Sequence, residues 1–452
     1  MQRFKTHTLF GWGRTPSYIC KSWRAEQICH IAERLQQTDD TLIARGCGRS
    51  YGDASLQPNG VMHLHRMDKI LSYDKKAGII TAQSGVTLQD IMQLCLSDGW
   101  MLPVLSGTQH VSLGGALASN IHGKNQYHTG NIANHISHCS IMLADENVVS
   151  CSPSQHSELF YATAGGMGMT GIIIDVTLQL KRISSAQLNV DTKKVASLED
   201  MLECFEVSKH HYEYMVGWID HFATGNNLGR GVFERANHVD KNYNNTPLTV
   251  AKQKKPITIP DIIPSFVLNR YSMALYNKIR FNTYDTQWRQ ETTGFERFFH
   301  PLDNLNHWNR LYGKRGFYQY QCIVPENSDT LKNILLLLRT IQQRKCFSYL
   351  AVIKYHKSHR SMFSFDMNGY SIALDFPNTQ QSVALQSELN HIVADIGGRI
   401  YLAKDALLER KAFEKMYADQ LPQWKETLSH IDPQARFTSL MSQRLGFKDY
   451  TS

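Results

Sequence analysis

The sequence predicts an α+β fold in which a mixed N-terminal part is followed by a part built mainly from antiparallel strands. Up to about residue 185, short strand-like segments alternate with amphipathic helical segments. From there to about residue 398 the strand-like segments are rich in aromatic residues. After residue 398 a strand-turn-helix pattern returns. We therefore expect one unit over 1–185 and a second over 186–398.

The N-terminal part is expected to hold helices at 24–40, 87–99 and 157–166 and a long β-branched strand at 170–180. Thr87 and Asp90 have the spacing of a capping box, and Gly99 is suited to end the helix that they begin.

The second part is expected to hold strands at 281–288, 316–325 and 349–357, where aromatic residues recur. The segment 236–265 of this second part is polar and carries four prolines, so we expect a mobile loop or lid there.

The stretch 262–281 mixes apolar residues with Arg270, Lys278 and Arg280. Such a segment suits either a membrane surface or the neighbourhood of a lipid substrate. An ordinary core helix is the alternative, and it is the interpretation favoured here.

Composition narrows the class of protein. The 452 residues carry a formal charge of +8, which suits anionic partners, but no dense Lys/Arg run is present, so no nucleic-acid partner is expected. Nine cysteines without a C-x-x-C pair indicate reduced thiols. The N-terminus lacks an apolar signal region, and no window holds 18 apolar residues, so we expect a cytoplasmic protein. His356 and His359 have no second ligand pair, and no metal site is expected.

Three stretches are dense in glycine: "ARGCGRSYGD" (44–53), "PVLSGTQHVSLGGALASNIHGKN" (103–125) and "GGMGMTG" (165–171). Glycine lets backbone N–H groups approach a ligand closely, and such loops suit phosphates. The third stretch matches G-x-G-x-x-G, but it follows a helix and precedes a strand, the reverse of the dinucleotide-binding order. The three loops together predict a large ligand that bears phosphate.

These stretches, with "ELFYATAGGMGMTGII" and the C-terminal "GGRIYLAKD", resemble the vanillyl-alcohol-oxidase/PCMH family of FAD enzymes, and the similarity spans nearly the whole chain. The resemblance implies a PCMH-type FAD-binding domain of two subdomains over 1–185, completed by a C-terminal segment over 399–452. It also implies an inserted substrate domain over 186–398 that contains the antiparallel sheet.

The resemblance places the FAD pyrophosphate on the backbone of the first glycine stretch, where consecutive N–H groups stand beside little side-chain bulk. The second stretch would form the other wall and run along the flavin. The residues expected to contact FAD are Ala44, Arg45, Gly46, Cys47, Gly48, Arg49, Ser50, Tyr51, Gly52, Asp53, Gly107, Ser112, Leu113, Gly114, Gly115, Ser119, Asn120, Ile121, His122, Ile173 and Tyr401.

Three residues are expected to be catalytic. Relatives with a covalent flavin often carry histidine where this chain has Tyr51, so we expect FAD without a covalent bond and a phenol near the reacting atoms. By the same resemblance, Lys404 occupies the position of a lysine that is essential in the similar enzymes. A cation there would stabilise negative charge on the flavin or hold the sugar hydroxyl that loses its proton. His122 is expected in the same cavity.

On the substrate side the resemblance implies Lys124, Gln321 and Lys354, together with Lys404. Lysines suit a sugar joined to a lipid through phosphate. Relatives that nitro-aromatic compounds inhibit covalently carry cysteine where this chain has Ala373, so such compounds are expected to bind without a thiol adduct.

The resemblance implies oxidation of a secondary hydroxyl, C2 of a polyprenyl-phosphoryl ribose, by hydride transfer to flavin N5. A separate NAD(P)H-dependent short-chain reductase would then complete an epimerisation. Such a substrate leaves open a peripheral contact with the inner face of the membrane. Two alternatives remain: an alditol or aldonolactone oxidase acting on a soluble sugar, and a lipid-sugar-binding protein without catalysis.

Overall fold

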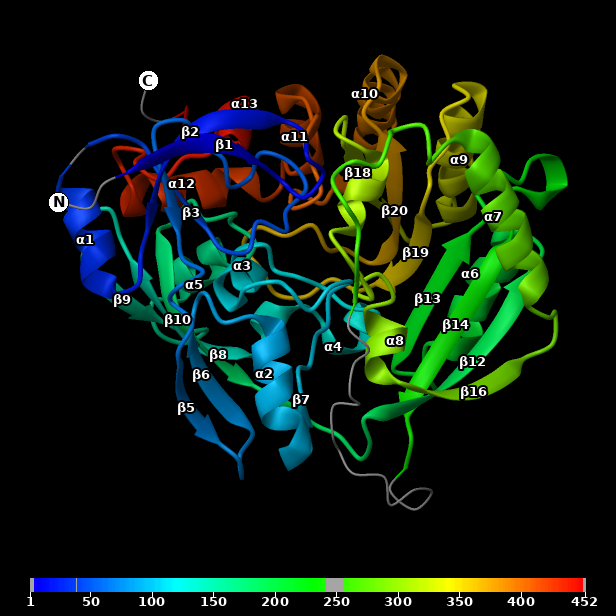
Figure 1. Cartoon of the computed structure of the whole chain (residues 1–452), viewed down its shortest axis with the longest axis horizontal. Coiled ribbons are helices and arrows are strands. Elements are labelled where there is room, and N and C mark those ends of the chain that lie inside the picture. The colour runs from blue at the N-terminus through cyan, green and yellow to red at the C-terminus, as the bar shows by residue number, and fades with distance from the viewer. Residues whose placement is uncertain (1–3, 38, 241–255, 450–452) are drawn as a thin grey trace.

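The computed structural model describes residues 4–37, 39–240 and 256–449. Its N-terminal part contains two larger sheets (Figure 1). The four-stranded sheet has the order β1 (Lys5–Phe10), β2 (Ser17–Arg24), β4 (Val61–His63) and β3 (Ile43–Arg45). The five-stranded sheet has the order β5 (Ile70–Asp74), β6 (Ile79–Gln83), β10 (Ile172–Gln179), β8 (Ile136–Met142) and β9 (Val148–Cys151). Mixed helices and antiparallel sheets confirm the predicted α+β class.

Short helices connect these strands. They are α1 (Ile28–Gln36), α2 (Leu88–Cys95), α3 (Leu113–Ala118), α4 (Gln126–Thr129) and α5 (Ser157–Thr163). The predicted capping box is present at α2, where the Thr87 hydroxyl accepts from the Asp90 N–H and the Asp90 carboxylate accepts from the Thr87 N–H. The predicted strand at 170–180 is confirmed as β10.

An eight-stranded sheet forms the second part (Figure 1). Its order is β16 (Arg289–Gly294), β12 (Gln187–Val195), β14 (Gly231–His238), β13 (Tyr214–Ile219), β19 (Ala351–His356), β20 (Gly369–Pro377), β18 (Phe317–Pro325) and β21 (Arg399–Ile400). Two further strand pairs join β7 (Trp100–Met101) to β11 (Lys181–Arg182) and β15 (Ile257–Thr258) to β17 (Leu305–Asn306).

The strands predicted at 316–325 and 349–357 are confirmed as β18 and β19. β18 is buried along almost its whole length, which accounts for its run of apolar and aromatic residues. The strand predicted at 281–288 is wrong, because this stretch holds the end of a helix and a turn, and the strand begins only at Arg289.

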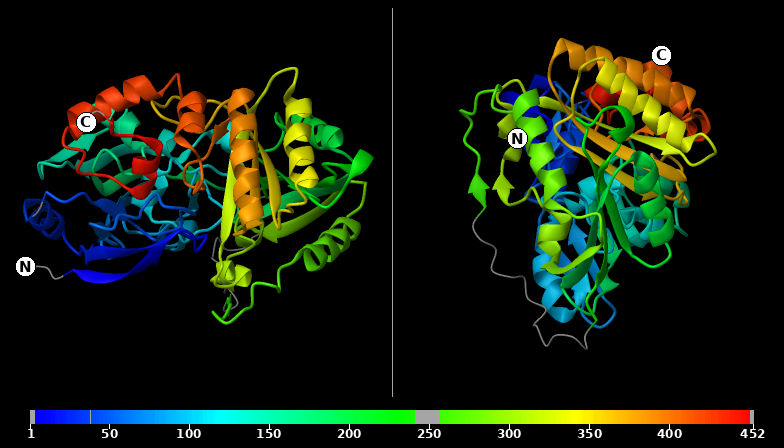
Figure 2. Two further views of the ribbon diagram at one scale, coloured as in Figure 1. Left: turned by 90° about the horizontal axis from the view of Figure 1, so that it is seen from above. Right: turned by 90° about the vertical axis from the view of Figure 1, so that its right-hand side faces the viewer.

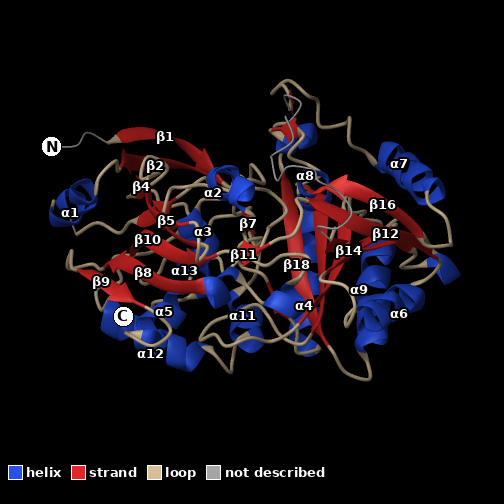
Figure 3. Ribbon diagram, turned by 90° about the horizontal axis from the view of Figure 1, so that it is seen from below, coloured by secondary structure: helices blue, strands red, loops and turns tan. Residues whose placement is uncertain are grey.

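Helices lie on both faces of this sheet (Figure 3). One face is covered by α6 (Leu198–Ser208), α9 (Thr330–Gln343) and α10 (Gln380–Asp395), which pack against β14, β18 and one another. On the other face lie α7 (Arg270–Thr283) and α8 (Phe295–Phe299). The face that carries α6, α9 and α10 is called the helix-covered face below. The face that carries α7 and α8 is called the exposed-helix face.

The structure corrects the favoured interpretation of 262–281 as a core helix. α7 has a capping box between Asn269 and Ser272, but Asn277 is its one buried residue. The predicted loop at 236–265 begins inside β14 and includes β15, and its stretch 241–255 lies outside the described residues.

The C-terminal helices α11 (Arg410–Met416), α12 (Leu421–Ile431) and α13 (Leu440–Leu445) return to the N-terminal part (Figure 2). α12 packs on α5. The Arg444 guanidinium in α13 pairs with Asp53 at 2.8 Å and with Asp405 at 2.9 Å. One arginine therefore ties the loop after β3 to the turn after β21.

No helix among residues 4–37, 39–240 and 256–449 is long and apolar enough to cross a membrane. All nine cysteines are free, and seven of them are buried.

Candidate functional site

A cavity of about 570 Å³ lies between the N-terminal part and the exposed-helix face of the eight-stranded sheet. Its N-terminal walls are the glycine-rich stretches at 44–55, 105–122 and 167–171. Residues of β13, β18, β19 and β20 form the wall across from them, and the turn at 401–404 closes one side. The sheet and all three glycine stretches thus meet in a single site.

The first glycine stretch presents free backbone donors to this cavity. In the described part of the chain, none of the N–H groups from Gly46 to Ser50 donates to a protein acceptor. A Cβ on Gly46 would lie 2.0 Å from the Ser112 hydroxyl, and one on Gly52 would lie 2.0 Å from the Asp405 carbonyl oxygen. Glycine at these two positions lets the loop approach its neighbours, and its unpaired N–H groups suit an anion.

Arg49 adds positive charge beside these donors. Its guanidinium lies 4.0 Å from the Trp12 ring centroid, and its buried Nε has no protein partner. A fixed cation next to unpaired amides fits the pyrophosphate of a dinucleotide. The residues present therefore fit the cofactor that the sequence resemblance implies.

Lys404 enters the cavity from the turn that follows β21, and its Nζ lies 4.0 Å from the Tyr51 ring centroid. Burial lowers the pKa of Lys404 to about 7, with Lys354 adding to this effect and Asp375 opposing it. Burial also raises the pKa of Tyr51 well above its ordinary value. The phenol is therefore neutral near pH 7, and the lysine is poised between its charged and neutral forms.

Asp375 lies behind this pair on β20 and was missed in the sequence. Its carboxylate accepts hydrogen bonds from the Gln319 amide at 2.6 Å and from the Tyr312 hydroxyl at 3.1 Å. Burial raises its pKa to about 6, against the effect of Gln319 and the Lys404 charge. A single acidic residue inside the apolar strand "YSIALDFP" is the signal that would have pointed to it.

Two more lysines face the cavity. Burial lowers the pKa of Lys354 to about 8, and the Lys124 charge adds to this effect. Lys124 donates to the Phe298 carbonyl at 2.6 Å and lies 3.9 Å from Glu234. Burial lowers the pKa of Lys124 to about 8, while Glu234 opposes the shift. Three half-buried lysines around one cavity suit an anionic ligand.

His122 is enclosed by aromatic rings. The Gln321 amide donates to its Nε2 at 3.0 Å, and the rings of His356 and Tyr401 lie 4.7 and 5.2 Å away. Burial lowers the pKa of His122 well below its ordinary value, and the Lys354 charge adds to this. His122 is therefore a neutral imidazole whose orientation is fixed by Gln321.

His356 serves a buried network. Its Nδ1 lies 2.8 Å from an Asp366 carboxylate oxygen, and its Nε2 lies 2.8 Å from the Ser371 hydroxyl. In the described part of the chain no three His, Cys, Asp or Glu side chains are grouped so that they could hold a metal ion.

The structure brings most of the sequence-predicted residues together. Those that line the cavity are Ala44, Gly46, Cys47, Gly48, Arg49, Ser50, Tyr51, Gly107, Ser112, Gly114, Gly115, Ser119, Ile121, His122, Lys124, Ile173, Gln321, Lys354, Tyr401 and Lys404. Their roles stay predictions, but their common location agrees with a shared ligand.

Five of the predicted residues, Arg45, Gly52, Asp53, Leu113 and Asn120, are not among those that line the cavity, and their contact with FAD stays a prediction. Arg45 donates to the Phe10 carbonyl at 2.7 Å and Asp53 pairs with Arg444. Leu113 is fully buried in a hydrophobic core, and the Asn120 side-chain oxygen accepts from the Ala133 N–H. Gly52 packs on the Asp405 backbone.

Three further cavity residues come from the middle of the chain. Trp218 on β13 and Tyr276 and Arg280 on α7 line the side away from the glycine loops. Arg280 lies 4.8 Å from the Trp218 ring. Spacing gives no reason to single out Trp218 and Tyr276, whereas Arg280 is one of the basic residues of 262–281, a stretch for which the neighbourhood of a lipid substrate is one interpretation of the sequence.

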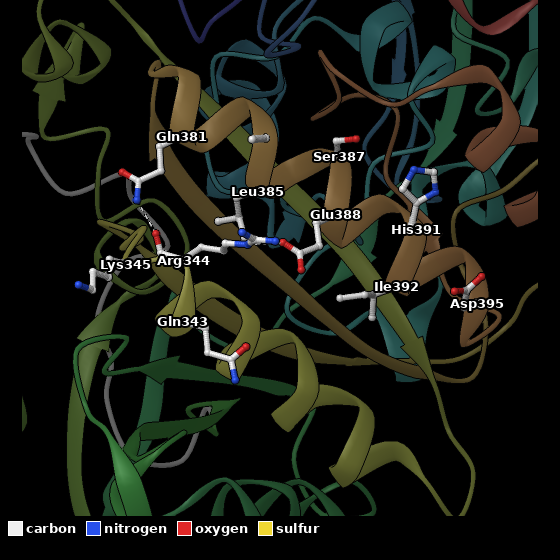
Figure 4. Close-up of a pocket in the computed structure, with 11 residues that line it drawn as sticks. Gln343, Arg344, Lys345, Gln381, Leu385, Ser387, Glu388, His391, Ile392 and Asp395 are labelled. Atoms are coloured by element: carbon white, nitrogen blue, oxygen red, sulfur yellow. Dashed lines mark hydrogen bonds and ion pairs between the residues drawn. The ribbon is translucent and has the colours of Figure 1, made fainter.

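A second hollow, of about 760 Å³, lies between the end of α9 and α10 (Figure 4). Its lining is polar and includes the ion pair of Arg344 with Glu388 at 2.7 Å. It lies on the helix-covered side of the sheet and contains none of the predicted site residues. The chemistry therefore belongs to the cavity and not to this hollow.

Comparison with known proteins agrees with the geometry of the cavity. Residues 16–152 match the family model of an FAD binding domain. The chain is 30% identical over 457 residues to decaprenylphosphoryl-β-D-ribose oxidase of Mycolicibacterium smegmatis, covering 97% of each chain. It is also 30% identical over 164 residues to L-gulonolactone oxidase of Scyliorhinus torazame, covering 36% of this chain and 37% of the relative. It is 24% identical over 224 residues to D-arabinono-1,4-lactone oxidase of Yarrowia lipolytica, covering 48% and 42%.

The similarity to the first relative runs end to end, whereas the lactone oxidases match less than half of the chain. The FAD-binding model covers two of the three glycine stretches that line the cavity. The chain therefore uses FAD, and it belongs to the PCMH-type family of FAD-linked oxidoreductases that includes decaprenylphosphoryl-β-D-ribose oxidase.

Proposed function

We propose that this enzyme oxidises the C2 hydroxyl of a polyprenyl-phosphoryl ribose to a ketone. The observation that carries the proposal is the set of three half-buried lysines, Lys124, Lys354 and Lys404, in the same cavity as the unpaired amides of 46–50. The end-to-end similarity to an oxidase of a decaprenylphosphoryl ribose supports the substrate class. The product would be the substrate of a separate NAD(P)H-dependent reductase, and the two steps together would invert C2.

FAD, when bound, supplies the acceptor for the hydride that leaves C2. Lys404 takes the hydroxyl proton, because a base with a pKa near 7 combines sufficient neutral fraction with sufficient basicity. Asp375 holds that pKa up, since its carboxylate favours the charged form of Lys404. Tyr51 places a neutral ring under the ammonium and keeps water from it.

Gln321 and His122 orient the sugar. The Gln321 amide is fixed by His122, so its oxygen can face a sugar hydroxyl. Lys354 and Lys124 hold the phosphate, because ammonium groups bind it as point charges. Both are less basic than ordinary lysines, and a phosphate would restore their charge.

The same proposal covers the cofactor linkage, the organisation of the chain and its surroundings. Tyr51 cannot form a histidyl bond to FAD, so the cofactor is held without a covalent link. Residues 1–185 and 399–452 form the FAD-binding domain, and 186–398 form the substrate domain. The enzyme works in the cytoplasm as a peripheral protein at the inner face of the membrane, where its lipid substrate lies.

Flavin absorbance provides the test. Purified holoprotein mixed anaerobically with polyprenyl-phosphoryl ribose is expected to lose its absorbance near the flavin maximum. Protein that cannot be loaded with FAD, or holoprotein that stays oxidised with this substrate, would contradict the proposal.

A soluble sugar or sugar lactone is the second candidate, favoured by the similarity of 36% and 48% of the chain to two lactone oxidases. A panel of alditols and aldonolactones with peroxide detection separates the two substrates. Binding of a polyprenyl-phosphoryl sugar without flavin reduction would instead indicate a binding protein.

A further inference from the structure

We propose that the outward face of α7 and the segment before it form a docking surface for an anionic lipid bilayer. This inference rests on the proposed lipid-linked substrate, and it specifies which face meets the membrane. The surface consists of Ile262, Phe266, Val267, Tyr271, Leu275 and Ile279, flanked by Arg270 and Lys278, and is named the α7 surface below.

The α7 surface exposes a cluster of apolar side chains to solvent. Seven of the twenty-one large apolar side chains that are exposed among the described residues lie between 262 and 279. Tyr271, Leu275 and Ile279 are 76%, 60% and 59% exposed and are spaced by four residues, so they share one face of the helix. Contiguous exposed apolar surface of this kind marks an interaction site.

Among the residues that the structure describes, few contacts hold α7 to the sheet, and those of Asn277 and Arg280 do not cover its outer face. The Asn277 amide donates to the Asp220 carboxylate at 3.2 Å, and Arg280 lies over Trp218. Asn277 is the one buried residue of the helix. These contacts fix the inner side of α7 without covering the outer one.

The charges of this segment indicate an anionic partner. Between residues 262 and 284 the chain has three basic residues, Arg270, Lys278 and Arg280, and no acidic one. The nearest acidic residue before the segment, Asp261, is neutralised by Arg14 at 2.7 Å. A helix with an apolar stripe and basic flanks matches a bilayer surface whose headgroups are anionic.

The α7 surface also adjoins the cavity. Tyr276 and Arg280, on the inner side of the same helix, line the cavity together with Trp308 and Phe298. Figure 1 shows α7 at the outer edge of the eight-stranded sheet, on the viewer's side. A lipid tail that leaves the cavity past Tyr276 therefore meets apolar side chains at once, and the substrate need not leave the bilayer completely.

Vesicle flotation of the FAD-loaded full chain tests the inference. Wild-type protein is expected to float with vesicles of phosphatidylcholine and phosphatidylglycerol and much less with phosphatidylcholine alone. The double variant Leu275→Ser/Ile279→Ser is expected to lower the partition coefficient about tenfold or more, because two apolar side chains no longer enter the lipid. Arg270→Gln/Lys278→Gln is expected to lower it roughly fivefold for each charge removed, with less effect at high salt.

Val207→Ser/Leu336→Ser provides the matched control. These residues are exposed on α6 and α9, on the opposite face of the sheet, and their replacement is expected to leave flotation unchanged. Wild-type protein that stays unbound, or a Leu275→Ser/Ile279→Ser variant that floats equally well, would overturn the inference. Sedimentation velocity that shows a dimer abolished by this variant, without vesicle binding, would overturn it in favour of a second copy.

Failure of the docking surface is distinguishable from failure of the proposed function. Leu275 and Ile279 do not line the cavity, so the double variant is expected to reduce its flavin with detergent-dispersed polyprenyl-phosphoryl ribose at the wild-type rate. Flavin reduction in detergent without vesicle binding would contradict only the inferred docking surface. Vesicle binding without flavin reduction would contradict only the proposed reaction.

Discussion

The ammonium of Lys404 lies 4.0 Å from the centre of the Tyr51 ring, although 353 positions separate the two residues in the chain. The contact joins the first glycine stretch to the C-terminal turn that bears the lysine. It holds a cation where desolvation and the nearby Lys354 charge lower its pKa to about 7, although the Asp375 charge opposes the shift.

Replacement of Lys404 by alanine is expected to remove turnover and to leave FAD bound. Loss of a group that takes the proton and stabilises charge costs about 10²–10⁴-fold in rate. Stopped-flow measurement of flavin reduction checks the rate, and the absorbance of the purified protein checks the cofactor. Lys411→Ala on the exposed surface of α11 is the control. Reduction by Lys404→Ala at the wild-type rate would exclude a role in the reaction.

The pH profile of kcat/KM is expected to rise through about pH 7, because only neutral Lys404 accepts the hydroxyl proton. Asp375 raises the pKa of Lys404, so Asp375→Asn should move the inflection to lower pH. Rate profiles of the two proteins between pH 5 and 9 provide the measurement. An inflection that shifts upward in the variant would contradict the assigned interaction.

FAD is expected to leave the protein on acid precipitation. The family resemblance places Tyr51 where relatives with a covalent flavin often carry histidine, and a phenol cannot form the histidyl link. The supernatant should contain all of the flavin, in equimolar amount to the precipitated chain. Flavin that stays with the pellet, or a peptide heavier by the mass of FAD, would refute this expectation.

Ala373→Cys is expected to make the enzyme sensitive to covalent nitro-aromatic inhibitors. Ala373 lines the cavity on β20, directly opposite Gln321 on β18, so a thiol there would face the bound compound. Intact-mass measurement after turnover should show an adduct on the variant and none on the wild type. An adduct on the wild type would mean that another of the free cysteines, such as Cys47 in the cavity wall, reacts instead.

Arg444→Met is expected to lower the free energy of unfolding by about 3 kcal/mol, because Asp53 and Asp405 would remain buried without their cation. Urea denaturation measures the change. Arg410→Met, which removes exposed pairs with Glu414 at 2.8 Å and with Asp449, is the control and should cost at most about 1 kcal/mol. Equal losses in the two variants would show that the buried pairs carry no special weight.

Local signals in the sequence predicted those features of the site that depend on nearby residues. The capping box at Thr87 and the strands β10, β18 and β19 follow from spacing and composition. Dense runs of glycine are conspicuous in a sequence, so composition alone predicts the three loops that line the cavity. Lys404 was found through resemblance, since a single lysine carries no local pattern.

Features that depend on distant partners could not be predicted. Asp53 lies in a glycine stretch that suits a ligand, but it is engaged by an arginine 391 positions away. Asp375 acts on Lys404 through the fold and not through spacing. α7 has the composition of a core helix, and only the arrangement of the sheet decides that its apolar side faces outward.

The eight-stranded sheet has one further practical consequence. The hollow between α9 and α10 lies across the sheet from the cavity and from the α7 surface. An antibody fragment raised against that side, or an affinity handle placed there, would hold the enzyme with its cavity and α7 pointing away from the support. Immobilised in this orientation, the protein could meet lipid and substrate from solution at the same time.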